Sequence, residues 1–411
     1  MTNVVHGSNL RTVRYLTYLM FMMFAMTTDA VGVIIPEVMK QFDLSLTAAG
    51  LLHYGPMMAI AISGMFLGHL ADKLGRKKTI ILGLSLFAAN SFLFIVGSSF
   101  AFYLTLMVLS GLAIGVFKTA ALALIGDITS STREHTSIMN GAEGFFGVGA
   151  IIGPLIVTYL LTQGLEWKWL YVSAAVLCVV IIIIASRVKY PETMQKTIEP
   201  INFKRTLAMT KDRFALSFSI GAFLYVATES AIYVWMPTYL IGYDGSALLL
   251  ATYALTIFFV LRAAGRFIGM WAMARFNWSM VMVILSGAIA VCFVISVVAG
   301  RDWAVYLLPL SGLFMSAIYP TLNSKGISCF EKNKHGAAAG VILFFTALGA
   351  ACGPLIMGIV SDANGGQAVY GFIVATGFSL VLFAGFLYNL VKDPTRQRLL
   401  ELEQSEYKAL A

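Results

Sequence analysis

Among the ionisable residues inside long apolar stretches of this sequence, five lie deepest or pair most readily, namely Asp29, Lys118, Glu143, Glu229 and Arg262. A charged side chain in such surroundings costs several kcal/mol, so each is a candidate functional group. Loss of water favours the protonated form of a carboxylate, and Asp29 and Glu229 are therefore candidate proton carriers. The alternative for each acid is a structural role, either in a salt bridge or in contact with water.

The two cations, Lys118 and Arg262, each allow two interpretations. A buried ammonium needs a carboxylate partner, so Lys118 either forms a fixed salt bridge to Asp29 or Glu143 or binds an anionic substrate. The guanidinium of Arg262 stays charged and can hold a carboxylate through two bonds, which fits either a substrate or a salt bridge to another helix. In both cases the chemistry is binding and charge compensation, and no catalytic residue is indicated.

The elements that position these residues are predicted to be membrane-spanning helices. Of the 411 residues, 59% are hydrophobic and only 12% are charged, and the apolar runs are long enough to cross a hydrocarbon layer of about 30 Å as helices. We therefore predict an all-α integral membrane protein of 12 transmembrane helices. The expected spans are 13–36, 47–70, 79–97, 102–126, 138–162, 168–186, 213–240, 246–274, 278–299, 303–327, 336–361 and 367–391.

The basic residues predict the orientation of these helices. Most of the 28 lysines and arginines fall in alternate loops and at the chain ends, whereas the opposite loops hold only Lys40, Lys168 and Arg301. The positive-inside rule then places both termini in the cytoplasm. We expect a multi-pass protein of the plasma membrane, as in a bacterial inner membrane.

A polar stretch divides the chain into two halves that resemble diverged copies. We predict a six-helix bundle at 1–186, a cytoplasmic linker at 187–212, a second six-helix bundle at 213–392 and a cytoplasmic tail at 393–411. Small residues and prolines recur at nearly constant offsets, the matched pairs being Pro36 with Pro237, Gly64 with Gly265, Gly115 with Gly312, Gly149 with Gly349 and Gly153 with Gly353. Two pseudo-symmetric bundles of this kind are typical of carriers that rock about a central site.

Other classes of function are disfavoured by what the sequence contains. The four cysteines have no CxxC spacing, so we expect no metal site and no cofactor. The net charge of +8 comes from loop residues, which argues against a nucleic-acid partner. A membrane enzyme or receptor would need a soluble domain or a clustered constellation of reactive side chains, and we expect neither.

The loop between the second and third spans carries Gly68, Leu70, Asp72, Gly75, Arg76 and Lys77. A carboxylate at the end of a helix is disfavoured by the helix dipole, so Asp72 needs a partner, either Arg76 or the N-terminus of a neighbouring helix. This segment resembles the G-x-L-x-D-x-x-G-R-K/R signature of the major facilitator superfamily. The resemblance implies a conformational latch at Gly68, Asp72, Gly75, Arg76 and Lys77. The alternative is a solvated basic loop.

The resemblance also implies a binding cavity lined by the first, fourth, seventh and tenth helices. These helices would gather Asp29, Lys118, Glu229, Tyr319 and Asn323 around one volume, with Glu143 nearer the cytoplasmic end of the fifth helix. The resemblance further implies that the protein binds a small-molecule substrate and lies in the lipid bilayer. It also implies that a single chain is the functional unit.

A looser resemblance to the fucose and hexose proton-symporter branch covers the C-terminal half. It rests on Tyr225 to Tyr239 with Glu229 and Trp235, on Tyr319-Pro320 through Lys325-Gly326, and on Gly349 to Gly358 with Ser361-Asp362. That branch's acidic residue in the fourth helix is replaced here by Lys118. We expect a secondary active transporter of a small polar solute, a sugar or a small organic anion, working by proton-coupled symport.

The segment from Gly149 to Pro154 supports a competing interpretation. It resembles the fifth-helix motif of antiporters in the same superfamily, although Leu155, Ile156 and Val157 stand where that motif continues with glycines. Glycines four residues apart also let two helices approach closely, so a packing role is the alternative. A drug/proton antiporter is therefore the second expected function.

Overall fold

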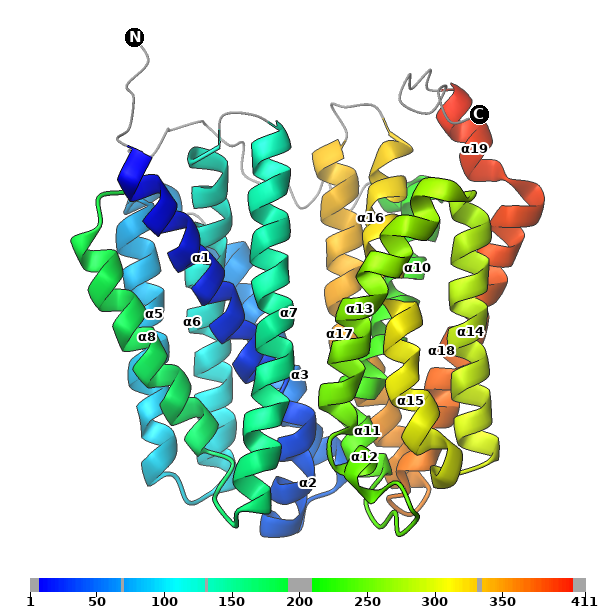
Figure 1. Cartoon of the computed structure of the whole chain (residues 1–411), viewed down its shortest axis with the longest axis horizontal. Coiled ribbons are helices and arrows are strands. Elements are labelled where there is room, and N and C mark those ends of the chain that lie inside the picture. The colour runs from blue at the N-terminus through cyan, green and yellow to red at the C-terminus, as the bar shows by residue number, and fades with distance from the viewer. Residues whose placement is uncertain (1–6, 68–69, 130–131, 191–208, 331–334, 402–411) are drawn as a thin grey trace. The chain divides into compact units, whose positions relative to one another are not determined.

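The computed structural model describes residues 7–67, 70–129, 132–190, 209–330 and 335–401, and these form helices joined by short loops (Figure 1). Within these ranges, twelve helical segments are long and apolar enough to cross a membrane, which confirms the predicted fold class. The chain divides into two compact units, unit 1 at 1–196 and unit 2 at 197–411, and each is described by itself. Most of the predicted linker, 191–208, lies outside the described residues.

Unit 1 contains six membrane-spanning segments. Its helices are α1 (Gly7–Thr28), α2 (Val31–Phe42), α3 (Leu46–Leu67), α4 (Leu70–Lys73), α5 (Arg76–Phe92), η1 (Leu93–Val96), α6 (Phe100–Asp127), α7 (Thr132–Thr162) and α8 (Trp169–Arg187). The first span is formed by α1 and α2 together and reaches Phe42, further than the predicted end at residue 36. Pro36 did not mark the boundary because it sits inside α2.

Unit 2 also contains six spans. Its helices are η2 (Met209–Lys211), α10 (Arg213–Ser230), η3 (Ala231–Trp235), α11 (Met236–Tyr239), α12 (Leu248–Thr252), α13 (Ala254–Arg275), α14 (Trp278–Val298), α15 (Arg301–Met315), α16 (Ile318–Ser328), α17 (His335–Ala363), α18 (Ala368–Lys392) and α19 (Pro394–Glu401). The short helix α19 begins within the segment predicted to be a tail.

The two units share one internal arrangement of helices. In unit 1, α1 packs along α7, α3 along α6 and α5 along α8. In unit 2, the corresponding helices pack as α10 along α17, α13 along α15 and α14 along α18. The first helix of each bundle therefore lies against the fifth, the second against the fourth and the third against the sixth. This correspondence is what a diverged six-plus-six repeat predicts.

Paired glycines set the closest helix contacts in both units. A Cβ atom at Gly149 or Gly153 of α7 would overlap the carbonyl oxygens of Met22 or Met26 in α1. In the same way, a Cβ at Gly349 of α17 would lie 2.6 Å from the carbonyl oxygen of Phe223 in α10. Glycine at these positions lets the two backbones touch, which is the packing role of small residues in membrane helices.

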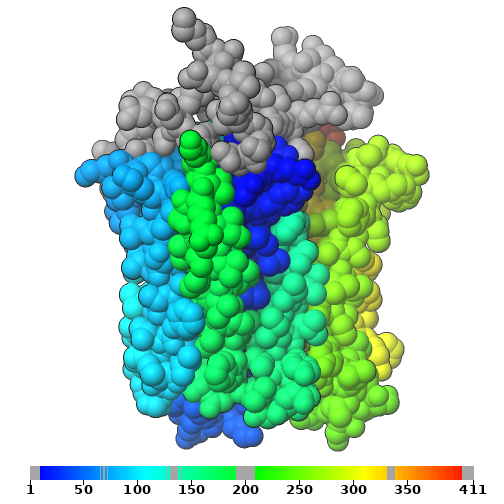
Figure 2. Space-filling model, turned by 60° about the vertical axis from the view of Figure 1, so that its left-hand side comes forward, coloured from blue at the N-terminus to red at the C-terminus, as the bar shows by residue number. Residues whose placement is uncertain are grey.

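Helix α8 lies on the outer surface of unit 1. Figure 2 shows it (green) between α5 (light blue) and α1 (dark blue). Several of its aliphatic side chains are exposed, including Val176 at 53% and Ile183 at 44%. Continuous exposed aliphatic surface is costly in water but favourable against lipid tails. This face is therefore suited to the hydrocarbon layer.

Three spans are interrupted partway along their length. The first span breaks at Asp29 and Ala30, between α1 and α2. The seventh passes through the π-helical turn η3 directly after α10, and the tenth breaks at Ser316 and Ala317, between α15 and α16. Irregular backbone within membrane helices is tolerated where it is buried in protein or lines a cavity, and π-turns concentrate at functional sites. These breaks direct attention to the side chains beside them.

Candidate functional site

A buried ion pair in unit 2 joins the seventh and eighth spans. Nη2 of Arg262, in α13, lies 2.9 Å from Oε1 of Glu229, in the last turn of α10. The side chain of Glu229 is 8% exposed and that of Arg262 is 20% exposed. Removal of either partner would leave a charge with little water around it, which is strongly destabilising. Of the two roles left open for Arg262, the structure shows the salt bridge to another helix.

Tyr225 connects this ion pair to the break in the tenth span. Its hydroxyl lies 2.6 Å from Oε1 of Glu229 and 2.9 Å from the carbonyl oxygen of Met315. Met315 is the last residue of α15, directly before the break at Ser316 and Ala317. A tyrosine hydroxyl has one proton and can donate it to only one acceptor at a time. The carboxylate and the helix break therefore compete for the same donor.

Two predicted cavity residues in α16 lie near this group. The ring of Tyr319 stacks on that of Tyr225, with centroids 6.3 Å apart and planes at 20°. Asn323 stands one turn further on, and its Oδ1 atom is buried without a hydrogen-bond donor among the described residues. A buried acceptor of this kind is a candidate contact for a donor on a polar solute. The structure thus groups Glu229, Arg262 and Tyr319 through Tyr225.

The aromatic residues after Glu229 hold the helix in place. The indole of Trp235 donates a hydrogen bond of 3.0 Å to the carbonyl of Pro354 in α17, and the hydroxyl of Tyr239 donates to the carbonyl of Ser296 at 2.9 Å. Their exposures are 2% and 4%. These contacts give both side chains a packing role. They also anchor the π-turn η3 against neighbouring helices.

Lys118 in unit 1 is the other candidate cation predicted from the sequence. It projects from α6 so that Nζ lies 4.4 Å from the centre of the Phe24 ring on α1. The negative charges acting on it are those of Glu143, on α7, and Asp29, at the end of α1. Of the three expected members of this group, Glu143 is the most exposed. The structure therefore brings Asp29, Lys118 and Glu143 into one electrostatic cluster, and the aromatic face adds a cation–π contact.

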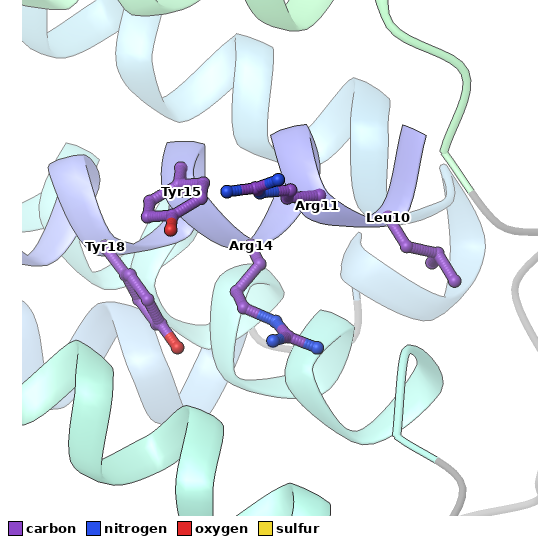
Figure 3. Close-up of a pocket in the computed structure, with 5 residues that line it drawn as sticks. All are labelled: Leu10, Arg11, Arg14, Tyr15 and Tyr18. Atoms are coloured by element: carbon purple, nitrogen blue, oxygen red, sulfur yellow. The ribbon is translucent and has the colours of Figure 1, made fainter. Parts of the chain in front are cut away.

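The first turns of α1 carry a pocket of about 390 Å³ lined by Leu10, Arg11, Arg14, Tyr15 and Tyr18. Figure 3 shows Arg14 and Tyr18 projecting from the same side of the helix, with Arg11 lying toward Tyr15. The guanidinium of Arg11 is 5.9 Å from the Tyr15 ring centre. The ring of Tyr18 stacks on Phe145 of α7 at 5.2 Å. Arginines and tyrosines at a span end are typical anchors at a membrane interface.

The predicted latch segment connects three helices of unit 1. Gly75 adopts φ 85° before the first turn of α5, a region that favours glycine. Arg76 pairs with Asp127 at the end of α6, Nε to Oδ2 2.8 Å, and its side chain is 4% exposed. Nζ of Lys77 donates to the carbonyls of Ser186, in the last turn of α8, and of Val188, directly after the helix, each at 2.8 Å. Arg76 and Lys77 thus tie the start of α5 to the ends of α6 and α8.

The remaining latch residues lie at the limit of the structure. Gly68 and the side chain of Asp72 lie outside the described residues, although the backbone of Asp72 is part of α4. The proposed partners of Asp72 therefore stay predictions. Among the residues that the structure does describe, no group of three or more His, Cys, Asp or Glu side chains is arranged to hold a metal ion.

Three functional contacts were not found from the sequence alone. Tyr225 is four residues before Glu229, a spacing that places two side chains on one helix face, so this contact was accessible from the pattern. Asp127 ends the fourth span, where a carboxylate needs a cation, and Arg76 was the nearest basic candidate on the same side. The contact with the Met315 carbonyl could not be predicted, because every residue has a backbone carbonyl and the side-chain types do not indicate which one is used.

Comparison with known proteins identifies the family. Residues 17–346 match the sequence profile of the Major Facilitator Superfamily. The match covers most of the chain, and this protein belongs to that superfamily. It is a transporter of small-molecule solutes in a lipid bilayer and not an enzyme, and it is a multi-pass protein of the plasma membrane.

Several relatives and solved structures show the range within the family. The quinolone resistance protein NorA of Staphylococcus aureus (strain MRSA252) is 25% identical over 386 residues, which cover 90% of this chain and 94% of NorA. The nucleoside transporter NupG has a TM-score of 0.75 at 15% identity, over 92% of this chain and 99% of NupG. The E. coli fucose:proton symporter FucP has a TM-score of 0.62 at 21% identity, over 92% and 99% of the two chains. The structural likenesses show the fold.

Proposed function

We propose that this transporter is a proton-coupled symporter of a small, neutral, polar solute, and that Glu229 is the proton-binding group. The observation that carries the proposal is the buried ion pair of Glu229 with Arg262, completed by the hydroxyl of Tyr225. An ionisable acid placed beside two helix interruptions in a membrane bundle has the features of a coupling site.

Proton binding at Glu229 changes its interactions with both neighbours. The ionised carboxylate pairs with Arg262 and accepts the hydroxyl proton of Tyr225. The protonated acid forms no ion pair, and breaking a buried pair costs about 3 kcal/mol or more. Arg262 then favours a conformation in which its guanidinium reaches water or another acceptor. Protonation of Glu229 thus changes the relative free energies of the conformations that α10 and α13 can adopt.

Tyr225 carries the same change to the tenth span. When Glu229 is ionised, the hydroxyl of Tyr225 donates to its Oε1 atom. When Glu229 is protonated, the acid itself becomes a donor, and the hydroxyl of Tyr225 turns to the carbonyl of Met315. This bond stabilises the end of α15 at the break before α16. Tyr319 and Asn323, on the far side of the break, would move with that end and so couple proton binding to solute binding.

The charge inventory favours a neutral solute. Glu229 neutralises Arg262 within unit 2, and Lys118 is under the influence of two acids within unit 1. An anionic solute is needed only where buried cations lack carboxylate partners. Arg262 has such a partner, and Lys118 has two acids in its electrostatic surroundings, so a sugar or another polyhydroxylated neutral solute fits better than a small organic anion. Buried acceptors such as Oδ1 of Asn323 suit its hydroxyl groups.

Transport in proteoliposomes with an imposed pH gradient tests this function. The purified protein is reconstituted, and uptake of radiolabelled hexoses, nucleosides and small carboxylates is followed with the acidic side outside or inside. We expect accumulation of one neutral polar class only when protons move in the same direction as the solute. Accumulation that is independent of the pH gradient would contradict proton coupling, and preferential accumulation of carboxylates would contradict the neutral solute.

Drug/proton antiport is the second candidate, favoured by the likeness to NorA over 90% of this chain. In that case the same acids would bind protons, but the solute would move against the proton flow. Adding a quinolone and a lipophilic cation to the same proteoliposome assay separates the two. Accumulation of either compound on the acidic side supports antiport, because an antiporter exchanges protons leaving that side for solute entering it.

We also propose that both termini are cytoplasmic and that one chain is the functional unit. With twelve spans the two ends emerge on one side of the membrane, and the distribution of lysine and arginine favours the cytoplasm. Protease protection of tags at both ends in oriented vesicles tests the first statement. A fusion of one inactive and one active chain tests the second statement. If each chain works independently, this fusion should have half the transport activity of a fusion of two active chains.

A further inference from the structure

Unit 2 contains a deep apolar groove that the transport function does not use. It has a volume of about 460 Å³ and lies among α10, α14, α16, α18 and α19. Its walls are formed mainly by aliphatic and aromatic residues, with Leu322 and Leu382 buried within. Ile220, Val381 and Tyr388 also line it and are 43%, 57% and 62% exposed, so the groove is accessible from the side.

The depth of the groove corresponds to one leaflet of a bilayer. On α10 its lining begins at Arg213 and reaches Leu224, eleven residues or about 16 Å along the helix. On α18 it runs from Asn389 back to Val381, about 12 Å. Half of a hydrocarbon layer of about 30 Å is about 15 Å. The groove therefore starts at a helix end and extends through the thickness of one leaflet.

The open end of the groove is basic. The guanidinium groups of Arg213 and Arg398 lie 5.0 and 5.6 Å from the ring centre of Phe214, which lines the groove. In addition, Nζ of Lys325 lies 5.6 Å from the ring of Trp278, another lining residue. The neighbouring acid, Asp212, accepts hydrogen bonds from the first amides of α10.

We infer that this groove binds one anionic glycerophospholipid from the leaflet at which α10 begins. An acyl chain lies along the apolar walls, and the phosphate group is held among Arg213, Lys325 and Arg398. The argument is one of complementarity: three cations surround the mouth, one leaflet depth of apolar surface follows, and the side is open to lipid. Basic pockets between membrane helices are suited to anionic headgroups. This inference goes beyond the transport function and does not depend on it.

Two glycines of α18 provide a matched pair of variants. A Cβ atom at Gly385, which lines the groove, would meet nothing within 4 Å, and the same holds for Gly377, which does not line it. At Gly385 the Cβ of a leucine therefore has room, and its side chain extends the wall into the groove, while Gly377→Leu makes the same change elsewhere on the same helix. For the headgroup, Arg213→Ala is compared with Arg275→Ala. Arg275 lies 5.0 Å from the Trp271 ring centre at a helix end of unit 2, away from the groove.

Native mass spectrometry of the full-length protein in detergent tests the site. Palmitoyl-oleoyl phosphatidylglycerol or the matching phosphatidylcholine is added, and retained lipid is counted. We expect wild type to retain one phosphatidylglycerol in preference to phosphatidylcholine. Gly385→Leu should lose that molecule, and Arg213→Ala should retain it about fivefold more weakly. Gly377→Leu and Arg275→Ala should behave as wild type, and thermal melting checks that all variants are folded.

Three results would overturn the inference. Equal retention of the two lipids by wild type would remove the anionic specificity. Unchanged retention in folded Gly385→Leu would place the lipid elsewhere. No retained lipid in wild type would indicate that another part of the chain occupies the groove.

Discussion

The hydroxyl of Tyr225 lies 2.6 Å from Oε1 of Glu229, one turn away on the same helix, and 2.9 Å from the carbonyl of Met315 on another. The acid and the helix break thus share one proton donor. Glu229 in turn pairs with Arg262. In the proposed function, a change of protonation at this acid would therefore act on α13 through Arg262 and on α15 through Tyr225.

Tyr225→Phe should uncouple proton binding from transport. The ring remains to stack on Tyr319, but the hydrogen bond to the carboxylate, worth about 1.5–3 kcal/mol, is lost. We expect accumulation driven by a pH gradient to fall tenfold or more, while solute exchange at equal pH continues. Tyr239→Phe is the control, since it removes a buried hydroxyl that donates to Ser296 and should affect stability alone. Equal loss of accumulation in both variants would contradict the relay.

Glu229→Gln should abolish uphill transport while leaving exchange. The amide keeps the shape of the side chain but cannot bind and release a proton. Asp29→Asn in unit 1 carries the same expectation, and the two variants are compared in one proteoliposome assay. The residue whose loss removes accumulation but not exchange is the coupling residue. Normal accumulation in both variants would disprove coupling through these acids.

The double variant Glu229→Gln with Arg262→Gln separates stability from coupling. Glu229→Gln alone removes the charge that pairs with Arg262, and we expect a loss of about 3 kcal/mol in stability. Removing both charges should restore most of that loss, as seen in thermal melting, because no buried charge is left uncompensated. Accumulation should stay absent. Recovery of accumulation in the double variant would show that the acid acts only as a structural partner.

Asp127→Asn should weaken the junction of α5 and α6. The pair with Arg76 is largely buried, so a double-mutant cycle with Arg76→Gln should give a coupling energy above about 1 kcal/mol. The more exposed pair of Lys168 with Glu166, in which the glutamate is 62% exposed, is the control, for which about 0.2–1 kcal/mol is expected. If the coupling energy of Arg76 and Asp127 is no larger than that of the control pair, the contact contributes no more to stability than a solvent-exposed salt bridge.

Gly149→Ala should destabilise the packing of α7 on α1. The added methyl group would overlap the carbonyl of Met22, and overpacking of this kind costs about 1–3 kcal/mol. Gly144→Ala on the same helix meets nothing within 4 Å and should be neutral or slightly stabilising. Melting temperatures of the two variants in detergent provide the measurement. Equal stability would argue that α1 can shift away from α7 without loss.

Long-range features of the fold were predictable because they depend on composition. The twelve spans followed from apolar runs of sufficient length, and the six-plus-six organisation followed from recurring prolines and glycines such as Pro36 and Pro237. The breaks within spans were not predictable. The π-turn after Ser230 and the interruption at Ser316 lie beside tertiary contacts that side-chain types do not reveal, among them the hydrogen bonds of Trp235 and Tyr225.

The candidate site was predictable in its members but not in its pairings. A charged side chain inside an apolar span is costly in free energy, and this makes it a functional candidate. Glu229, Arg262 and Lys118 were found in this way. The partner of Arg262 was not, because several acids lay at similar depth and side-chain direction around a helix decides between them. Sequence spacing places residues along a helix axis, whereas pairing depends on how neighbouring helices are rotated.

The contact of Tyr225 with Met315 has a counterpart at the repeat-related positions of unit 1. The offset that carries Pro36 onto Pro237 also carries Phe24 onto Tyr225 and Thr28 onto Glu229, and the offset that carries Gly115 onto Gly312 carries Lys118 onto Met315. Phe24 and Lys118 touch in unit 1, as Tyr225 and Met315 do in unit 2. One contact between the first and fourth helices of a duplicated bundle has thus persisted while its chemistry diverged, into a cation on an aromatic face in one copy and a proton donor beside an acid in the other. In the proposed function, the second bundle binds the proton at this contact, whereas the first bundle carries a positive charge at the corresponding place.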